Sequence, residues 1–494
     1  MTRRGLLGTA GASILGTGVP RLLRAQNIPP KNVLIIMSDQ HKRDCLGAAG
    51  DPVARTPNLD AFARTSLRFT NAYCTNPVCT PSRASILTGL YTHNHESWNN
   101  STPLPAKHKT IAHHFSRVGY MTGLVGKMHF VDAQTHGFDY KLDFNDWYQF
   151  LGPKTKLYAD ELGRPNSGSG LPQIDDLWRD FGDPWAGHRE LDDRQGAVAV
   201  GAISKIPEQD HFESFVARES IRFLRKQAAQ QQPFLLICSF LKPHDPFMPV
   251  ARFANMFRPE DMRLPDTWGK VDVTKVPAEI RSAIEHNVST PELGTPDGAR
   301  RRMAFYYANL AQMDDCTGSV LRALSELGLE RNTAVIYTSD HGEMLGEHGL
   351  WNKFEFYESS CGIPLMMRVP GISATGVCSS LLSQVGLLPT LAELCGVPVT
   401  SPLDGESFSA QLRRPETPTS GPVFAEYNLR NPKAKYMVRE GNWKYTFWTH
   451  DIPELYNLKT DPKEMSNLAP RPQYRDEVAR LKEKLFSWHK PSEV

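Results

Sequence analysis

Residues 79–89, CTPSRASILTG, place a cysteine, a proline and an arginine where a helix is expected to begin. Proline is favoured in the first turn of a helix, so Pro81 would leave Cys79 at the helix N-terminus. There the helix dipole and the free N–H groups stabilise negative charge, and Arg83 would add a fixed cation. A thiol in such surroundings has a lowered pKa and reacts as a nucleophile. The pattern therefore predicts covalent chemistry at Cys79.

Two apolar runs end in an acid that is followed by a second potential metal ligand. Asp39 ends the run NVLIIMSD, and Gln40 follows it. Asp340 ends the run TAVIYTSD, and His341 follows it. Either pair alone is typical of polar strand ends that meet water or cap a helix. Carboxylate and amide oxygens suit a hard divalent cation, however, and the arrangement occurs twice, which favours a metal site.

Basic residues follow other apolar runs. The stretch GKMHF holds Lys127 and His129 two positions apart, so on a strand both would point to one face. KPHDPF holds His244 just beyond a further run, and HGLWNKFEFYE brings Lys353 a short loop after His341. Singly, such residues are typical of solvated charges and structural histidines. Together with a metal ion they would form a pocket for an anion with several oxygens.

These side chains need a scaffold that brings distant strand ends together. Continuous apolar runs, typical of strands buried on both faces, cover residues 32–39, 119–126, 233–240, 333–340 and 364–370. Helical spacing of apolar residues occurs at 56–66, with Thr56 as the expected N-cap, and at 214–230 and 303–328. This alternation predicts an α/β domain with a mainly parallel sheet, in which ligands bind at the carboxyl ends of the strands.

The chain divides into three predicted parts. Residues 1–26 carry Arg3 and Arg4 before a weakly apolar run, which is typical of a twin-arginine export signal; the alternative is a frayed cytoplasmic N-terminus. Residues 27–396 form the predicted catalytic domain, with residues 152–210 as a long surface insertion. Residues 397–494 contain short exposed strands and a closing helix at 473–489, which predicts a smaller C-terminal domain.

Composition narrows the class of protein. The 494 residues are 40% hydrophobic and 22% charged, which is typical of a soluble enzyme. Lys+Arg (56) and Asp+Glu (54) nearly balance, so nothing attracts the chain generally to nucleic acid or to an anionic membrane. The eight cysteines form no CxxC or CxxH cluster, so a cysteine-based zinc site is not expected. No stable membrane insertion is predicted, because the apolar run near the N-terminus is too short.

The string at residues 79–89 resembles the signature of the type I sulfatases of the alkaline phosphatase superfamily. The resemblance continues from NVLIIMSDQ to ELYNLKTDPKEMSNLA, nearly the whole chain after residue 26. It implies an alkaline-phosphatase-like α/β fold: a large mixed, mainly parallel sheet sandwiched by helices, with a smaller C-terminal α+β subdomain. It also implies a sulfuric ester hydrolase that, given the predicted signal, is exported by the twin-arginine machinery to the periplasm or the cell exterior.

In that family the signature cysteine is a precursor. A formylglycine-generating enzyme oxidises it to Cα-formylglycine, whose hydrate, a gem-diol, is the nucleophile. The resemblance implies this modification at Cys79, with Arg83 orienting the modified residue. One hydroxyl of the gem-diol would attack sulfur, and loss of a proton from the other would expel sulfate and restore the aldehyde.

The resemblance also implies roles for five further side chains. Lys127 and Lys353 match the lysines that hold the sulfate oxygens. His129 matches the histidine beside the gem-diol, and His244 matches the one near the leaving oxygen. Asn100 stands where the choline-sulfatase-like branch has an asparagine near the ester group.

The metal ligands implied by the resemblance are Asp39, Gln40, Asp340 and His341, together with the modified Cys79. The usual ion in the family is Ca²⁺. The common sulfatase pattern has an aspartate in place of Gln40 and an asparagine in place of His341. The variant found here resembles the choline-sulfatase and phosphonate monoester hydrolase branches. One carboxylate fewer lowers the charge at the metal, which keeps Mn²⁺ and Mg²⁺ as alternatives.

Two other functions are compatible with these motifs. Hydrolysis of phosphonate monoesters or phosphodiesters would use the same formylglycine, but that branch has tyrosine and threonine where this chain has Lys127 and His129, so a sulfate ester is favoured. A catalytically dead binding protein would lack some of the reactive positions, whereas all are present here. The substrate implied is a sulfated small molecule or a sulfated sugar, and the motifs fit both.

Overall fold

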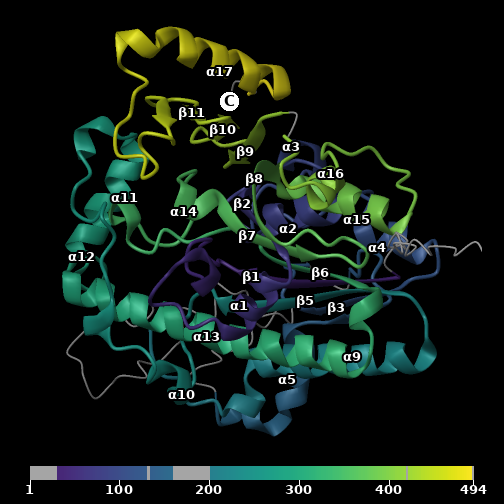
Figure 1. Cartoon of the computed structure of the whole chain (residues 1–494). Coiled ribbons are helices and arrows are strands. Elements are labelled where there is room, and N and C mark those ends of the chain that lie inside the picture. Colours follow the sequence, from purple (N-terminus) through teal and green to yellow (C-terminus); the bar gives the residue numbers. More distant parts are fainter. Residues whose placement is uncertain (1–30, 131–133, 159–200, 419–420, 492–494) are drawn as a thin grey trace, which may run out of the picture.

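A large mixed sheet forms the centre of the molecule (Figure 1). The computed structural model describes residues 31–130, 134–158, 201–418 and 421–491. The predicted export signal and most of the predicted insertion at 152–210 lie outside these residues. The eight strands of the sheet follow the order β4 (Tyr140–Leu142), β3 (Met121–Gly126), β5 (Phe234–Pro243), β1 (Asn32–Asp39), β6 (Thr333–Ser339), β7 (Gly362–Arg368), β2 (Leu67–Tyr73) and β8 (Gly376–Ser383).

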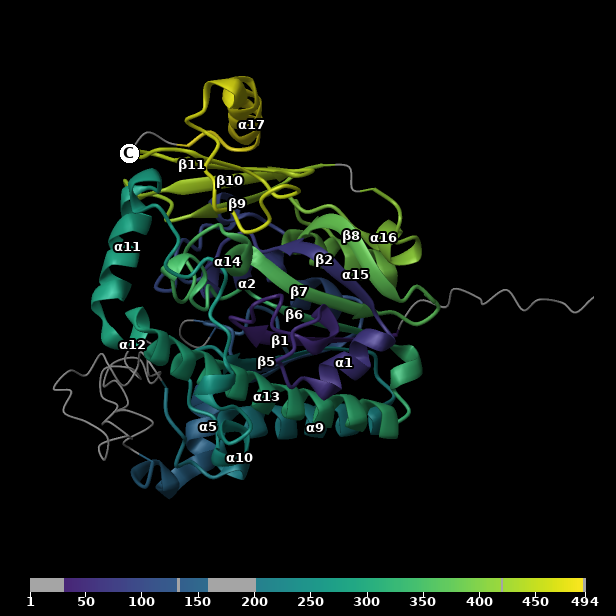
Figure 2. The same cartoon turned by 60° about the vertical axis from the view of Figure 1, so that its left-hand side comes forward.

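Helices cover both faces of this sheet. On one face lie α1 (Pro57–Arg64), α5 (Phe144–Leu151), α9 (Phe212–Gln230) and α13 (Pro296–Glu326), and Figure 2 shows α9 and α13 running side by side beneath the strands. On the other face lie α2 (Cys79–Thr88), α4 (Ile111–Ser116), α15 (Leu387–Cys395) and α16 (Ser409–Arg413). The shorter or peripheral helices are α3 (Thr92–His95), α10 (Ala251–Ala254), α11 (Ala278–Ser289), α12 (Pro291–Gly294) and α14 (Glu358–Cys361).

The continuous apolar sequence of β1 explains the two-sided core. Because side chains alternate along a strand, Leu34 and Ile36 point to the core between the sheet and helices α9 and α13. Val33, Ile35 and Met37 point to the opposite core, which also contains Ile86 and Leu87 of α2. Burial on both faces requires a run without polar alternation, as the sequence predicted for this strand.

The predicted parallel sheet is largely confirmed. β1 pairs in parallel with β5 and β6, and β3 pairs in parallel with β5. The apolar run at 364–370 belongs to β7, which is antiparallel to both β6 and β2, so the sheet is mixed. The predicted N-cap of α1 is only partly right. Thr56 occupies the N-cap position, but its side chain makes no capping hydrogen bond. The backbone N–H groups of Asn58 and Leu59 donate instead to the carboxylate of Asp314 on α13.

A four-stranded antiparallel sheet forms the C-terminal subdomain. Its order is β12 (Glu454–Asn457), β11 (Trp443–Trp448), β10 (Lys435–Glu440) and β9 (Val423–Tyr427). Val423, Ala425 and Met437 join the core of the main domain, whereas the other face is covered by Leu481 and Leu485 of α17 (Arg475–Trp488). The proposed boundary at residue 397 stays a prediction. In the described residues, no helix is both long and apolar enough to cross a membrane.

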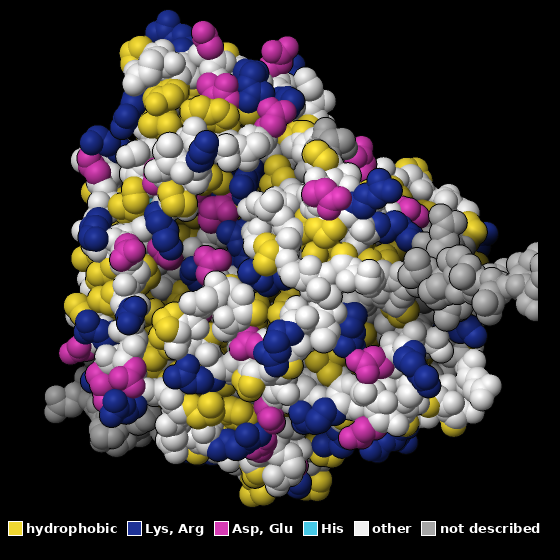
Figure 3. Space-filling model, in the orientation of Figure 1, with side chains coloured by type: hydrophobic (Ala, Val, Ile, Leu, Met, Phe, Trp, Pro, Cys, Tyr) yellow, Lys and Arg dark blue, Asp and Glu magenta, His cyan; other side chains and the backbone are white. Residues whose placement is uncertain are grey.

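The surface carries charges of both signs. In Figure 3, lysine and arginine side chains alternate with aspartate and glutamate over the visible face. This agrees with the nearly balanced counts of 56 basic and 54 acidic residues.

Buried histidines make the stability of the fold depend on pH. Burial lowers the pKa of His95 to about 3 and that of His348 to about 4. The unfolded chain therefore binds more protons than the folded one between pH 6.5 and 4, and stability is lost as the pH falls through this window. For His348 we expect the free energy of unfolding to fall by about 2 kcal/mol between pH 7 and pH 5.

Urea unfolding of His348→Asn at these two pH values tests this expectation. Asparagine tolerates the positive φ of residue 348 (59°), so the backbone is retained although the stacking on Tyr357 is lost. The difference in unfolding free energy between pH 7 and pH 5 should become smaller than in the unaltered protein. His286→Asn, at an exposed position, is the matched control and should leave this difference in unfolding free energy unchanged. An equal pH dependence of stability in all three proteins would show that His348 does not contribute to it.

Candidate active site

The candidate residues meet at the carboxyl ends of the central strands. β1 ends at Asp39, and Asp340 and His341 directly follow the parallel neighbour β6. Cys79 is the first residue of α2. The potential ligand atoms of these four buried side chains all lie within 4.8 Å of one another. The structure thus brings together residues that are up to 302 positions apart in the chain, from Asp39 to His341.

The thiol of Cys79 is surrounded by charged groups. Its Sγ lies 3.2 Å from His341 Nε2 and 3.7 Å from each of the two ammonium nitrogens of Lys127 and Lys353. It is also 3.7 Å from Asp39 Oδ1. Burial and Asp39 oppose ionisation, but the two lysines and His341 outweigh them and hold the pKa of Cys79 well below its usual range. These surroundings, at the N-terminus of a helix, stabilise negative charge on the group that occupies position 79.

Arg83 fixes this arrangement from within α2. Its side chain is 1% exposed and donates to Asp340 Oδ2 at 2.7 Å and to Asp39 Oδ2 at 2.8 Å. A third nitrogen donates to the backbone oxygen of Lys127 and, at 2.9 Å, to Ser239 Oγ. The guanidinium thereby ties the first turn of α2 to the ends of β1 and β6.

Lys127 and His129 reach the site from a loop, so the prediction that both project from one strand face is wrong. β3 ends at Gly126, whose φ is 110° and where a Cβ would lie 1.8 Å from the backbone oxygen of Ser239. This turn, which only glycine can make, directs the following residues toward α2. Lys127 Nζ lies 2.5 Å from Asp39 Oδ2, and His129 Nδ1 lies 2.9 Å from Thr80 Oγ1.

His244 and Lys353 contact each other on another side of the site. His244 directly follows β5, and its Nε2 lies 2.6 Å from Lys353 Nζ. Its other ring nitrogen lies 2.9 Å from Asp245 Oδ1. Burial and the two nearby lysines lower the pKa of His244, but Asp245 and Asp39 outweigh them and raise it to about 9. Because a pKa of about 9 keeps the His244 ring protonated at neutral pH, His244 can deliver a proton to a departing oxygen.

Asn100 lies beside the start of α2. Its Oδ1 accepts a hydrogen bond of 3.1 Å from the backbone N–H of Thr80, the residue after Cys79. Since Thr80 Oγ1 also meets His129, the first turn of α2 connects Asn100 and His129 to the position of Cys79.

Two acids that the sequence analysis did not single out support these residues. Asp245 is the fourth residue of the quoted stretch KPHDPF, and Glu343 follows Asp340 by three positions. Glu343 is fully buried and accepts hydrogen bonds from Gln40 Nε2 and from the backbone of Leu345 and Asn352. The sequence could have indicated Asp245 and Glu343 because each lies close in the chain to a predicted site residue. Buried polar ligands need hydrogen-bond partners for their remaining polar atoms, and neighbouring acids can supply them.

Glu343 determines which atom Gln40 presents to the site. Accepting from Nε2 leaves Gln40 Oε1 to face Lys353 Nζ, at 2.7 Å. In Glu343→Gln the new amide nitrogen would meet Gln40 Nε2, and Gln40 would turn its nitrogen toward the site. We expect divalent-ion affinity to fall about 10- to 100-fold. Calorimetric titration with Ca²⁺ measures this, with Glu393→Gln, far from the site, as the control. Unchanged affinity would show that Gln40 is not oriented by Glu343.

The donor set fits a hard divalent cation. Asp39 and Asp340 face each other, and burial together with the charge of Asp39 raises the pKa of Asp340 against the effect of Arg83. His341 Nδ1 lies 2.9 Å from the backbone oxygen of Gly342, which fixes the ring tautomer and leaves the lone pair of Nε2 directed at the site. Two carboxylates, an amide oxygen and an imidazole nitrogen would surround such an ion.

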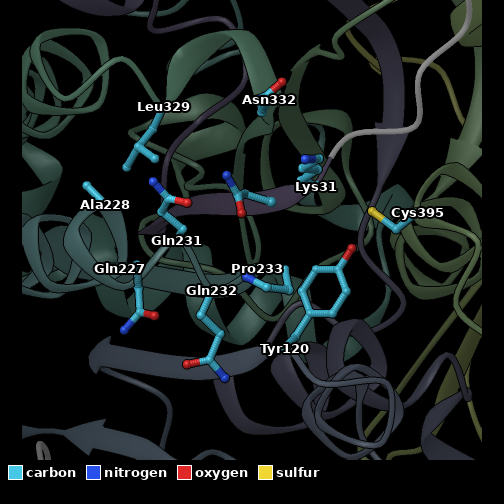
Figure 4. A pocket seen from close by; sticks show the side chains of 11 residues that line it. Lys31, Tyr120, Gln227, Ala228, Gln231, Gln232, Pro233, Leu329, Asn332 and Cys395 are labelled. Carbon is cyan, nitrogen blue, oxygen red and sulfur yellow. The ribbon is translucent and has the colours of Figure 1, made fainter.

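A wide cavity elsewhere in the fold takes no part in this arrangement. It has a volume of about 670 Å³ and lies where β1, β5 and β6 begin, at the opposite end of the sheet. Figure 4 shows its lining of amide and apolar side chains, such as Gln231, Asn332 and Leu329. None of the predicted site residues lines it.

Comparisons with known proteins identify the family. A family model described as Sulfatase matches residues 31–397, and one described as N-sulphoglucosamine sulphohydrolase, C-terminal, matches residues 346–490. The choline-sulfatase of Rhizobium meliloti (strain 1021) is 31% identical over 452 residues, which cover 89% of this chain and 83% of that protein. The chain belongs to the sulfatase family. It is a sulfuric ester hydrolase of the type I sulfatases in the alkaline phosphatase superfamily, as the resemblance implied.

Two further proteins are similar to this chain over most of its length. The arylsulfatase of Clostridium perfringens (strain 13 / Type A) is 28% identical, with 92% of this chain and 93% of that protein covered. The structure of the phosphonate monoester hydrolase of Agrobacterium radiobacter superposes with a TM-score of 0.75 at 26% identity, covering 93% of this chain and 95% of that one. The predicted fold class is thereby confirmed, including the mixed, mostly parallel sheet and the C-terminal antiparallel subdomain.

Proposed function

We propose that this sulfatase cleaves sulfate esters with formylglycine, formed from Cys79, as its nucleophile. The observation that carries the proposal is the set of groups around Cys79 Sγ, where Lys127, Lys353 and His341 lie within 3.7 Å. Such a site favours an anion with several oxygens, such as a sulfate ester, over a neutral substrate. Conversion of the cysteine requires a formylglycine-generating enzyme as a partner during maturation.

Asp39, Gln40, Asp340 and His341 are the side chains that would hold the metal ion. Ca²⁺ suits their oxygens best, with Mn²⁺ or Mg²⁺ as alternatives. When bound, the ion supplies positive charge next to the sulfate and next to the hydroxyl that attacks it.

The first half of the reaction transfers the sulfuryl group to residue 79. One hydroxyl oxygen of the hydrated formylglycine loses its proton to solvent and forms a bond to sulfur, while the bond from sulfur to the ester oxygen breaks. Lys127 and Lys353 stabilise charge on the peripheral oxygens of the sulfate. A proton passes from the ring of His244, which lies beside Lys353, to the departing alcohol.

The second half releases sulfate by elimination. The remaining hydroxyl of residue 79 loses its proton to His129, and its electron pair forms the aldehyde C=O. The bond from carbon to the sulfate oxygen breaks, so inorganic sulfate leaves and water then hydrates the aldehyde again. His129 is placed for this step, because its Nδ1 lies 2.9 Å from Oγ1 of Thr80, the residue next to Cys79, and burial and Lys127 lower its pKa, so its ring is neutral before the step.

The second candidate is hydrolysis of phosphonate monoesters, favoured by the structural likeness to the hydrolase of Agrobacterium radiobacter. We propose sulfate esters because Lys127 and His129 stand where that branch has tyrosine and threonine. The substrate would be a sulfated small molecule or sugar met after export by the twin-arginine route to the periplasm or the cell exterior.

Two aryl substrates with the same leaving phenol, a sulfate and a phosphonate monoester, separate these functions. The protein is first shown by mass spectrometry of the peptide that contains residue 79 to carry formylglycine, and it is loaded with Ca²⁺. We expect kcat/KM for the sulfate to exceed that for the phosphonate at least about tenfold. Faster cleavage of the phosphonate would assign the enzyme to the other branch.

A further inference from the structure

A second cluster of potential metal ligands lies away from the catalytic residues. It consists of His93 on α3, Glu426 on β9 and His489, the residue that follows α17. One ligand atom from each side chain lies within 4.8 Å of the others. Among the described residues, only this group and the catalytic one bring three or more such side chains so close together. Figure 1 shows α3 next to β9 on the side of α17.

The geometry places two imidazoles at a buried carboxylate. Glu426 is fully buried, and its two oxygens lie 3.0 and 2.9 Å from His93 Nδ1. The ring centroid of His489 lies 4.1 Å from that of His93, with the planes 20° apart, and the indole of Trp488 packs against both. The ion pairs of the described residues give Glu426 one cationic partner, His93. A buried carboxylate without lysine or arginine is stabilised by any cation that can enter.

From this we propose that His93, Glu426 and His489 bind a first-row transition-metal ion of the zinc class. Two imidazole nitrogens and one carboxylate oxygen form the donor set of such ions and leave a position for water, whereas Ca²⁺ prefers oxygen donors. The metal takes the place of the proton between His93 and Glu426. His489 turns its ring edge to the ion, which it can do because it lies beyond the last turn of α17.

The bound ion connects three segments that are far apart in the chain. α3 follows the catalytic helix α2 after a short turn, whereas Glu426 and His489 belong to the C-terminal subdomain. The backbone N–H of Glu426 also donates to the backbone oxygen of Thr75, four residues before Cys79. The metal therefore clamps the end of α17 and the edge of the small sheet to the part of the main domain that carries the nucleophile.

Titration of the Ca²⁺-saturated protein with Co²⁺ tests this site, because Co²⁺ replaces Zn²⁺ and absorbs visible light when bound. We expect one bound Co²⁺ for each chain with bands typical of nitrogen and oxygen ligands. His489→Phe keeps an aromatic ring on Trp488, and Glu426→Gln keeps the size of the side chain. Both should weaken Co²⁺ binding at least about tenfold. Zn²⁺ should raise the melting temperature of the unaltered protein and of neither variant.

Asp340→Asn separates the two clusters. It impairs the catalytic set, so binding of Co²⁺ that survives in Asp340→Asn and is lost in His489→Phe supports the second site. Binding that survives in His489→Phe and is lost in Asp340→Asn would overturn the proposal, because the ion would then occupy the catalytic residues. Failure of the unaltered protein to bind Co²⁺ beyond its Ca²⁺ would also overturn it and leave the three side chains as a hydrogen-bonded contact.

Discussion

Replacement of Cys79 by alanine is expected to abolish sulfate release while the fold is retained. The alanine side chain cannot be converted to an aldehyde, so the covalent route is closed and kcat should fall by about 10⁴-fold or more. The Sγ that is removed is small and lies among polar groups, so the cores on either side of the sheet keep their contacts. Circular dichroism and the release of an aryl alcohol measure the two effects.

Cys395→Ala is the matched control. Cys395 lies at the end of α15, in the lining of the cavity at the opposite end of the sheet. Its replacement changes the same kind of atom without touching the site, and activity should remain near that of the unaltered protein. Turnover by Cys79→Ala at a comparable rate would mean that water attacks the substrate directly, contrary to the proposed covalent step.

Removal of Lys127 should have the second largest effect. The ammonium lies 2.5 Å from Asp39 and 3.7 Å from Cys79 Sγ, so it stands where charge develops on the sulfate oxygens. In Lys127→Met the chain length is kept and the charge is lost. We expect kcat to fall about 10²- to 10³-fold, as for the loss of one preorganised donor in a water-excluded site. Steady-state kinetics with an aryl sulfate measure this.

Lys444→Met controls for the loss of a buried ion pair as such. Lys444 lies on β11 of the C-terminal sheet, and its ammonium, which is nearly as well buried as that of Lys127, pairs with Glu358 of α14 and with Glu464. We expect a lower melting temperature and a nearly unchanged kcat. If Lys127→Met and Lys444→Met lost activity equally, Lys127 would be acting through stability and not through the transition state.

The central strands could be predicted because burial on both faces leaves an uninterrupted apolar sequence. β2 and β8 were not predicted, since half-buried polar residues interrupt the apolar pattern of β2, and β8 is an edge strand with exposed Gly376 and Val377. The direction of β7 could not be predicted either, because an apolar run looks the same in parallel and antiparallel pairs. Here the reversal follows from pairing with β6 and β2 and not from a local signal.

The candidate site could be predicted as a set of residues but not as a geometry. Spacing suggested that Lys127 and His129 share a strand face, whereas Gly126 ends the strand and the loop aims them individually. Asp245 and Glu343 support the site through their contacts with His244 and Gln40. The spacing of residues in the sequence does not specify such contacts.

The most direct test relates sulfate release to the amount of formylglycine. The protein is produced with increasing amounts of a formylglycine-generating enzyme, and the modified fraction of the peptide that contains Cys79 is measured by mass spectrometry. Inorganic sulfate released from an aryl sulfate is then measured for each preparation, with Ca²⁺ in excess. The proposed function predicts a rate per chain that is proportional to the modified fraction and extrapolates to zero. A rate independent of that fraction would contradict it.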